Sequence, residues 1–531
     1  MRNQGLGSWP ARRARRTPEH TAWVHQGRRT GYRELHRRVQ LLAAALRGRG
    51  VRRGDRVAYL GENHPAFLET LFAAGLLGAV FVPLNTRSSA DEIGYVLADS
   101  GSTVLVRTAR HDESVTALHD RLPVRLPVTL GSPGAGEVGY EELLGGNGAE
   151  RDEDLDEPVG HDDACLIMYT SGTTGRPKGV VLTHGNLVWN CLDVVVDLDI
   201  TSATVALVHA PLFHAAALGM ICLPTLLKGG TVLLADFDPG RALELIPEHR
   251  VDFVFGVPTM YEAMSRHPGW ARADLSSLRI ALCGGARASD RTVRTCLDRG
   301  LPFAQGYGLT ETSPAATVVP PSYTARRPAS VGPANFFSDA RLVRPDGTDA
   351  AVGEPGEILL KGPHVMRGYW GRPDATDAVL RDGWLATGDI AVQDEDGFLR
   401  VIDRIKDMYV SGGENVYPAE VERVLAEHPG VLRCAVLGVP DDTWGEAGLA
   451  LVEPAAGGSV TGEELRAHVR GRLAAYKTPA TIRLVPGLPL NGAGKVDRAR
   501  LRARWAPTAP APDGPISDQA GRAPAATTTE A

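Results

Sequence analysis

The sequence predicts an α/β protein whose large N-terminal part is built from α/β sheets and whose small C-terminal part is an α+β domain. Two observations support this prediction. Over most of the chain, short apolar runs of strand length alternate with segments of helical period, which is typical of largely parallel sheets covered by helices. After Leu399 the pattern changes to a shorter set of elements that begins near a glycine pair.

The first elements of the large part alternate regularly between strand and helix. Strand-like runs cover residues 56–60, 79–84 and 102–107, and a segment of helical period covers 65–78 with its apolar residues on one stripe. Later strand-like runs, at 251–257 and 278–283, end near glycine or proline. Because ligands in open α/β sheets bind beyond the carboxyl ends of strands, we expect the functional site at such glycine-rich exits.

The small domain is predicted to begin near residue 402. Its expected elements are, in order, a helix (418–427), two strands (434–439 and 448–452), a helix (462–476) and a last strand (481–485). They occupy about a hundred residues, which is enough for a small α+β domain. The predicted limits are 1–402 and 403–505. Residues 506–531 are rich in Pro, Ala and Thr with little to bury, so we expect a disordered tail there.

The composition indicates a globular protein and excludes some functions. Hydrophobic residues make up 43% of the chain and charged residues 23%, so a large core can be buried. Lys plus Arg total 57 against 63 Asp plus Glu, a net charge of −6, which provides no basic field for nucleic acid. The arginines at positions 12, 13, 15 and 16 are expected to form a solvated helix face rather than a lipid contact.

Cysteine usage and apolar runs predict the compartment. The six cysteines are scattered, without CxxC pairs or metal-ligand spacing, and we interpret them as reduced core residues. The N-terminus lacks the apolar run of a secretory or twin-arginine signal, and no stretch approaches the roughly 18 consecutive apolar residues of a membrane span. We therefore expect no integral membrane segment and a cytoplasmic protein.

The segment 169–180, YTSGTTGRPKGV, is the strongest candidate for a site. It follows a strand-like run at 164–168 and interleaves glycines with hydroxyl side chains before a lysine, so amides, hydroxyls and one ammonium can converge on an anion. The spacing is not that of a Walker A loop. The alternative is a flexible surface turn. The candidate phosphate-binding residues are Thr170, Ser171, Gly172, Thr173, Thr174, Gly175 and Lys178.

This segment resembles the core signature of the AMP-forming, adenylate-making enzymes, which include acyl- and aryl-CoA ligases, peptide-synthetase adenylation domains and firefly luciferase. Further motifs of that family follow in order: QGYGLTE at 305–311, WLATGD at 384–389, DRIKDMYVSGGENVYP at 403–418 and NGAGK at 491–495. The resemblance extends from about residue 8 to 505. Five motifs in a fixed order are far more specific than any one of them alone.

The resemblance implies an active site in the cleft between the two domains, where ATP and Mg²⁺ activate a carboxylic acid. Negative charge must then be neutralised on the α-phosphate and on the leaving pyrophosphate. By resemblance, Lys495 bridges the carboxylate and the α-phosphate, Thr310 contacts that phosphate, and Glu311 binds Mg²⁺. The nucleotide-binding residues that the resemblance implies are Gly284, Gly285, Ala286, Gly306, Tyr307, Gly308, Asp389 and Arg404.

The resemblance also implies a second step, in which a mobile small domain turns about Lys406. Gly412 and Gly413 would then line the path of the CoA thiol, which attacks the adenylate and releases AMP. His214 would gate the passage to the acid pocket, the alternative being a core histidine. It stands where amino-acid-adenylating domains carry an aspartate, and its surroundings are apolar, so a fatty or aryl acid is predicted.

Other interpretations share part of this evidence. One retains adenylation but transfers the acyl group to a carrier protein, an amine or a small inorganic nucleophile. Another is a non-catalytic nucleotide-binding scaffold. A dinucleotide-binding loop at Gly134, Gly136 and Gly139 is disfavoured, because Glu137 stands where pyrophosphate would lie.

Three residues depart from the family pattern. Arg287 follows Gly-Gly-Ala where proline is frequent, and it either meets a polar group of the acid or points to solvent. Tyr409 stands where isoleucine is common, and Met220 could shorten the acid pocket. Tyr409 and Met220 weaken any specific prediction of a long-chain fatty acid.

Overall fold

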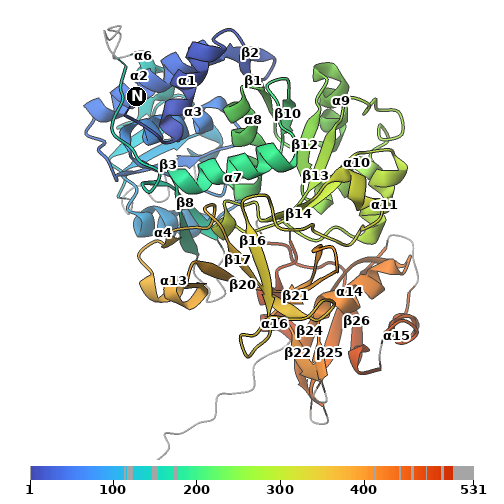
Figure 1. Ribbon diagram of the computed structural model, residues 1–531. Helices are drawn as coiled ribbons and strands as arrows, with labels where there is room; N and C mark the ends of the chain where they lie inside the picture. Colours follow the sequence, from blue (N-terminus) through green and yellow to red (C-terminus); the bar gives the residue numbers. More distant parts are fainter. Residues whose placement is uncertain are drawn as a thin grey trace, which may run out of the picture.

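The computed structural model contains four sheets and the helices that cover them (Figure 1). It describes residues 2–112, 115, 123–145, 154–170, 177–405, 407–411, 414–441, 444–455, 460–473, 475–491 and 495–505. Two sheets of eight strands form most of the large domain, and the chain then passes through a five-stranded sheet into the five-stranded sheet of the small domain. The predicted α/β fold with a smaller C-terminal domain is confirmed.

The first eight-stranded sheet has the order β18-β9-β8-β4-β3-β5-β6-β7. Its strands are β3 (Arg56–Leu60), β4 (Val80–Pro83), β5 (Val104–Arg107), β6 (Leu126–Thr129), β7 (Val138–Gly139), β8 (Ala164–Thr170), β9 (Lys178–Thr183) and β18 (Gly368–Tyr369). The strands from β7 to β8 pair in parallel, whereas β9 pairs antiparallel with both β8 and β18. Residues around 369 therefore lie beside the strands that flank the phosphate-binding candidate.

The second eight-stranded sheet has the order β15-β14-β13-β12-β10-β11-β1-β2. Its strands are β1 (Thr21–His25), β2 (Arg28–Gly31), β10 (Val205–Val208), β11 (Thr231–Leu234), β12 (Phe253–Gly256), β13 (Ile280–Cys283), β14 (Phe303–Tyr307) and β15 (Thr317–Val319). Its central strands pair in parallel, so their carboxyl ends open on one edge. His214 follows β10, Gly284, Gly285 and Ala286 follow β13, and the 305–311 motif begins in β14 and continues beyond it.

Helices pack between and around these sheets. They are α1 (Trp9–Arg16), α2 (Tyr32–Gly48), α3 (Pro65–Leu77), α4 (Ala90–Ser100), α6 (Tyr140–Gly145), α7 (His184–Asp197), α8 (Leu223–Lys228), α9 (Pro239–His249), α10 (Pro258–Arg266), α11 (Asp290–Asp298), α12 (Pro321–Thr324) and α13 (Pro373–Val379). A π-helical turn, Ala217–Cys222, precedes α8.

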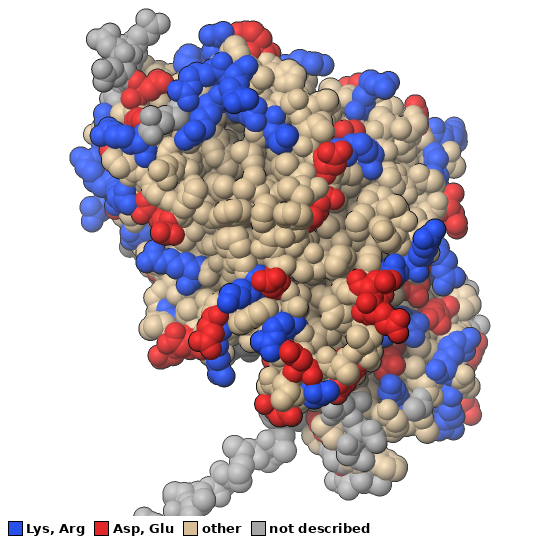
Figure 2. All heavy atoms as spheres, viewed as in Figure 1, with Lys and Arg blue, Asp and Glu red and all other residues tan. Residues whose placement is uncertain are grey.

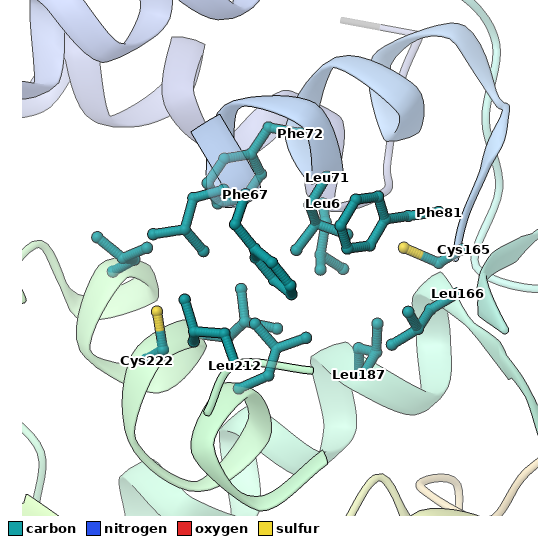
Figure 3. Close-up of a cluster of buried hydrophobic side chains, with 14 of the residues drawn as sticks. Leu6, Phe67, Leu71, Phe72, Phe81, Cys165, Leu166, Leu187, Leu212 and Cys222 are labelled. Atoms are coloured by element: carbon teal, nitrogen blue, oxygen red, sulfur yellow. The ribbon is translucent and has the colours of Figure 1, made fainter. Parts of the chain in front are cut away.

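Helix α3 differs from its prediction. The expected amphipathic helix with one apolar stripe is instead buried all round, because every residue from Ala66 to Leu77 is buried. Figure 3 shows its phenylalanines among side chains of β4, β8, α7 and the segment that follows β10. A helix that is surrounded by sheet and helix must be apolar on every face, and this one is the centre of the large core.

A five-stranded antiparallel sheet follows the two large ones, and the sequence did not predict it. Its strands are β16 (Asp339–Val343), β17 (Gly356–Lys361), β19 (Leu380–Arg381), β20 (Trp384–Gln393) and β21 (Leu399–Arg404). The expectation of largely parallel sheets fails here because β20 and β21 are joined by a tight turn rather than by a crossover helix. Asp394 holds that turn by accepting from the backbone N–H of Phe398 (2.9 Å).

The small domain contains the five predicted elements, some with other bounds, and adds β22, β23 and α16, which were not predicted. Its elements are β22 (Tyr409–Ser411), β23 (Glu414–Val416), α14 (Pro418–Glu427), β24 (Val431–Asp441), β25 (Gly445–Pro454), α15 (Gly462–Arg470), β26 (Thr481–Leu484) and α16 (Arg498–Trp505). The two predicted strands are the centres of a long antiparallel hairpin, β24–β25. Helix α15 ends before Gly471 instead of reaching residue 476.

The surface and the cysteines agree with the composition. Figure 2 shows acidic and basic side chains distributed over the viewed face, with arginines gathered over α1 at the top. Arg12, Arg15 and Arg16 are exposed there, as a solvated helix face requires, whereas the prediction is wrong for Arg13, which is half-buried and donates to the carbonyl of Leu227. All six cysteines are free, and all except the half-buried Cys434 are buried. Among the described residues, no helix has both the length and the apolarity needed to cross a membrane.

Candidate active site

The C-terminal lysine lies where the small domain meets the large one. The ammonium of Lys495 interacts electrostatically with Arg404, Asp389 and His214. Loss of solvent lowers the pKa of Lys495, the charge of Arg404 lowers it further, and Asp389 partly opposes this shift. Two reciprocal bonds with Asn491 fix the lysine backbone, from Asn491 N to Lys495 O (2.7 Å) and from Lys495 N to Asn491 Oδ1 (3.1 Å). The structure thus brings Lys495 together with residues from two other predicted motifs, 384–389 and 403–418, and with His214.

Asp389 contacts one residue from each of two other predicted motifs, 305–311 and 403–418. Its Oδ2 accepts a hydrogen bond from the hydroxyl of Tyr307 (2.7 Å), and its Oδ1 lies 3.2 Å from Nε of Arg404. The Asp389 side chain is 7% exposed, whereas that of Arg404 is 52% exposed, so the guanidinium faces the solvent-accessible side of the pair. Burial and the neighbouring Asp389 raise the pKa of Tyr307, which keeps its hydroxyl a donor.

The glycine segments after β13 and β14 lie against each other. A Cβ added to Gly284 would be 3.4 Å from the carbonyl oxygen of Gly306, so the two backbones pass in close contact. A Cβ on Gly308 would be 1.7 Å from the carbonyl oxygen of Pro314, which no side chain permits. Gly285 has φ +78°, a conformation that favours glycine. With the exposed Ala286, these residues form a continuous backbone surface beside Tyr307.

The stems of the phosphate-binding candidate are paired strands. Thr170 at the end of β8 pairs with Lys178 at the start of β9. Ser171, Gly172, Thr173, Thr174 and Gly175 lie outside the described residues, as do Lys406, Gly412 and Gly413. The roles of these eight residues therefore remain predictions.

Lys178, Tyr369 and Glu311 form a connected group beside those stems. The Lys178 ammonium lies 5.2 Å from the centre of the Tyr369 ring, and the Tyr369 hydroxyl donates to Oε1 of Glu311 (2.8 Å). Thr310 and Glu311 open a single 3₁₀ turn, and the Glu311 carbonyl accepts from Met366 N (2.8 Å). Tyr369 was missed from the sequence. The only signal for it is a Gly-Tyr-Trp run far from the other motifs in the chain.

His214 follows β10 in a turn that Asn63 stabilises. The backbone N–H of Leu212 donates to Asn63 Oδ1 (2.9 Å), and His214 N donates to Pro211 O (3.1 Å). Burial, together with the charges of Lys495 and Arg87, lowers the pKa of His214 to about 4. The imidazole is therefore neutral near pH 7, and the electrostatic influence of Lys495 on it indicates that His214 lies on the side of the large domain that faces this lysine. Asn63 and Arg87 were also missed, because neither belongs to a glycine-rich motif.

The segment before the small-domain sheet is anchored by one buried carboxylate. Asp403 accepts from Arg404 N (2.8 Å) and from Ala419 N (2.7 Å), so it ties the end of β21 to the start of α14. Burial raises the pKa of Asp403. This carboxylate therefore fixes Arg404 relative to the small domain.

The three departures from the family pattern occupy different environments. Arg287 has exposed surface, but loss of solvent lowers the pKa of its guanidinium, so both of its predicted alternatives stay open. Met220 is buried in the π-helical turn, and Tyr409 is buried in the small-domain core. Of the three, only Met220 lies in the segment that follows the His214 turn.

Glu311 is chemically suited to hold Mg²⁺ at this site. Mg²⁺ prefers oxygen ligands and is typically bound by one or two carboxylates, with phosphate and water oxygens completing its shell. Glu311 is half-buried, and its carboxylate accepts a hydrogen bond from the neutral hydroxyl of Tyr369. The described residues hold no group of three or more His, Cys, Asp or Glu suited to a metal, so an ion here would rely on ATP oxygens.

Known proteins are similar to this chain in sequence and in fold. The chain matches the AMP-binding enzyme family over residues 10–370 and the AMP-binding enzyme C-terminal domain over 420–495. A feruloyl-CoA synthase of an Amycolatopsis species is 55% identical over 506 residues, which cover 95% of this chain and 100% of that protein. The o-succinylbenzoate CoA synthetase of Bacillus subtilis, solved with its acyl-adenylate intermediate, has a TM-score of 0.82 at 33% identity and covers 93% of this chain and 98% of its own.

A third similarity concerns a different acceptor. The amide bond synthetase of Marinactinospora thermotolerans has a TM-score of 0.86 at 30% identity, covering 94% of this chain and 100% of its own. Together with the site geometry, these similarities define an adenylate-forming enzyme. The chain belongs to the AMP-binding enzyme family. It is an AMP-forming acid–CoA ligase, which activates a carboxylic acid with ATP and transfers the acyl group to CoA.

Proposed function

We propose that the acid is a hydroxycinnamic acid such as ferulate. The observation that carries this proposal is the 55% identity with a feruloyl-CoA synthase over that protein's full length. The buried, mostly apolar residues near His214, including Met220, Phe255 and Met260, suit the flat ring and propenoic arm of such an acid.

The first step forms one bond and breaks one. A carboxylate oxygen of the acid attacks the α-phosphorus of ATP, and pyrophosphate leaves with the electron pair of the broken P–O bond. We assign Lys495 to the charge that develops between carboxylate and α-phosphate, with Thr310 on that phosphate. The loop 170–175 and Lys178 hold the leaving phosphates, and Glu311 would hold Mg²⁺, whose charge neutralises phosphate oxygens.

Binding of the nucleoside falls to the group around Asp389. We assign the ribose hydroxyls to Asp389 and Arg404, which already form an ion pair at 3.2 Å. Adenine would lie against Tyr307 and the backbone surface of 284–286 and 306–308. In this arrangement the Tyr307 hydroxyl donates to one oxygen of the Asp389 carboxylate, and the other side of that carboxylate would face the sugar.

The second step transfers the acyl group. The CoA sulfur attacks the carbonyl carbon of the adenylate, the thiol proton is lost, and AMP leaves. We assign the thiol path to Gly412 and Gly413, the hinge to Lys406 and the gate to His214. The small domain (403–505) would turn relative to the large domain (1–402) between the steps. We place the reaction in the cytoplasm, where ATP and CoA are available.

The experiment is an acid panel with two readouts. Ferulate, coumarate, cinnamate, benzoate and decanoate are each incubated with ATP and Mg²⁺, with and without CoA, and pyrophosphate and acyl-CoA are measured. We expect kcat/KM for ferulate or coumarate to exceed that for benzoate and decanoate by at least about tenfold, which corresponds to ~1.4 kcal/mol. Equal values for decanoate, or a preference for benzoate, would refute the assignment.

A second candidate retains adenylation but uses another acceptor. The fold similarity to an amide bond synthetase supports an amine as that acceptor. The same panel with a primary amine or a phosphopantetheinylated carrier protein in place of CoA tests it. Amide or carrier-bound product at a rate above that of acyl-CoA would favour this second candidate.

A further inference from the structure

Tyr369 lies between two residues of opposite charge that do not pair with each other. Its ring faces the Lys178 ammonium at 5.2 Å from the ring centre, and its hydroxyl donates to Glu311 at 2.8 Å. Within the described part of the chain, neither Lys178 nor Glu311 forms an ion pair. One neutral side chain is therefore the shared neighbour of both charges.

An ammonium and a carboxylate this near to one residue would ordinarily combine. An ion pair between them would have to be broken before ATP and Mg²⁺ could bind, and its free energy would be subtracted from the binding of both. A cation–π contact contributes about 0.5–1 kcal/mol where solvent has access, and a phenol hydrogen bond to a carboxylate contributes about 1.5–3 kcal/mol. Both contacts are easily exchanged for a phosphate oxygen or a metal ion.

The ring is held in place from several sides. Tyr369 pairs with Val180 in the β18–β9 ladder, and its backbone N–H donates to Oγ1 of Thr376 (2.9 Å). The next residue, Trp370, donates from its backbone to Gly179 O (2.7 Å) and from its indole to Asp99 O (3.1 Å). The ring position is thus set by the same strand that carries Lys178.

The carboxylate of Asp99 ties this strand to the other stem of the phosphate loop. It accepts from the Tyr169 hydroxyl (2.7 Å) and lies 2.6 Å from a guanidinium nitrogen of Arg372. Tyr169 precedes the loop on β8, and Arg372 follows the Tyr369 strand. A shift of the ring would therefore require both stems to move.

We propose that Tyr369 is a positioning residue of the ATP site, which keeps Lys178 and Glu311 apart in the free enzyme so that each is available to the triphosphate and to Mg²⁺. This inference rests on the proposed assignment of Lys178 to phosphate and of Glu311 to the metal. The phenol remains a donor because burial and the nearby Glu311 charge raise the pKa of Tyr369.

Calorimetric titration of the full chain with ATP in the absence of Mg²⁺ tests the separation directly. In Tyr369→Leu, Lys178 and Glu311 can pair, and we expect the Kd for metal-free ATP to rise about fivefold to tenfold. Adding Glu311→Gln to that variant removes the pair and should restore the Kd to within about twofold of the single Glu311→Gln variant. A double variant as weak as Tyr369→Leu would overturn the proposal, because lost packing alone is not rescued at position 311.

Tyr369→Phe keeps the ring and tests the hydroxyl separately. Its Kd for metal-free ATP should match that of the parent, whereas the Mg²⁺ concentration that half-saturates ATP binding should rise about threefold or more, because Glu311 is no longer oriented. An unchanged Mg²⁺ requirement would contradict the role of the hydroxyl. Tyr140→Phe is the matched control, since it removes a tyrosine–carboxylate bond of 2.7 Å to Glu69 in the distant core.

Failure of the underlying assignment has a different signature. If Lys178→Met leaves the Kd for metal-free ATP unchanged, Lys178 does not bind the triphosphate, and the proposed function of the loop fails first. If Lys178→Met weakens ATP but the Tyr369 variants do not, only the separation is refuted.

Discussion

Removal of the Lys495 charge should abolish most of the adenylation rate and spare the second step. In Lys495→Met the side chain keeps its length and loses its ammonium. A unit charge about 4 Å from a developing negative charge contributes roughly 4 kcal/mol at an effective dielectric constant of 20. That value suits a site from which solvent is partly excluded, as the lowered pKa of Lys495 indicates. The same size of effect, about 10²- to 10³-fold in rate, follows from loss of one preorganised donor.

The assay separates the two half-reactions. Acid-dependent pyrophosphate release without CoA should fall about 10²- to 10³-fold in Lys495→Met. Thioester formation from chemically prepared acyl-adenylate should fall less than about threefold, since the lysine acts on the α-phosphate. Lys361→Met, at a surface lysine that donates to the Asp382 carbonyl, is the matched control. Pyrophosphate release within threefold of the parent would refute the role of Lys495.

The pH dependence gives a second check on Lys495. Because its pKa is lowered, the charged form is lost at a lower pH than the ordinary value of 10.5. Pyrophosphate release by the parent should therefore decline as the pH rises toward that value. In Lys495→Arg the guanidinium stays charged, so the residual rate should show no such alkaline decline. An identical alkaline limb in both proteins would assign it to another group.

Three further predictions concern stability. Gly308→Ala places a Cβ 1.7 Å from a carbonyl oxygen and should prevent folding or lower the melting temperature sharply. Gly48→Ala is the matched control, because its Cβ would lie in open space at the end of α2. It should raise the stability of the folded protein by about 0.5–1 kcal/mol in thermal melts. Tyr409→Phe removes a buried hydroxyl that has no partner among the described residues. Chemical denaturation should therefore show an unfolding free energy equal to or above that of the parent. Tyr409→Ala should instead lower the unfolding free energy by about 3–5 kcal/mol. Burial lowers the pKa values of His209 and His364 to about 4, so their contribution to stability is complete above about 6.5 and is lost as the pH falls toward 4. His364→Asn should reduce the loss of unfolding free energy between about pH 6.5 and 4, as measured by urea titration at each pH. An unchanged dependence of that free energy on pH would contradict the argument.

The sequence predicted most of the large sheets because local pattern and burial agree there. The strand-like runs at 56–60, 251–257 and 278–283 became β3, β12 and β13 with shifts of a few residues at most. Their apolar side chains are buried on both faces, so the signal was continuous. Helix α14, Pro418–Glu427, matched its predicted bounds, since proline can open a helix and the apolar positions keep one face.

The antiparallel sheet of 339–404 was not predictable by the same reasoning. Its β17 strand, Gly356–Lys361, buries alternate residues and leaves the others half-buried or exposed, so its apolar content is diluted. Strand β20 has ten residues and carries Trp384, Thr387 and Asp389 within one strand. A long strand with many polar residues lacks the apolar pattern from which strands are predicted. The 384–389 motif could therefore be found in the sequence, whereas the sheet that positions it could not.

The candidate site was predictable only where the chemistry is carried by a local motif. Asp389, Tyr307 and Lys495 lie in three separate motifs, and the structure brings all three together with His214. Tyr369 belongs to no glycine-rich segment, and it enters the site because β18 pairs with β9 nearly 190 positions earlier in the chain. Such a contact depends on sheet register, which the sequence pattern of a two-residue strand does not encode.

The use of lysine supports the division of roles within the site. The chain has only six lysines among 57 cationic residues, and two of them, Lys178 and Lys495, contact the groups described above. Arginine presents a planar fork that pairs bidentately with carboxylates. At position 178 an arginine could stack on the Tyr369 ring and still reach Glu311 with its fork, which would restore the ion pair that the tyrosine prevents. The compact ammonium of lysine interacts with the face of the Tyr369 ring but does not reach past the ring to Glu311. Lysine is therefore the cation that the ring can keep separate from the carboxylate.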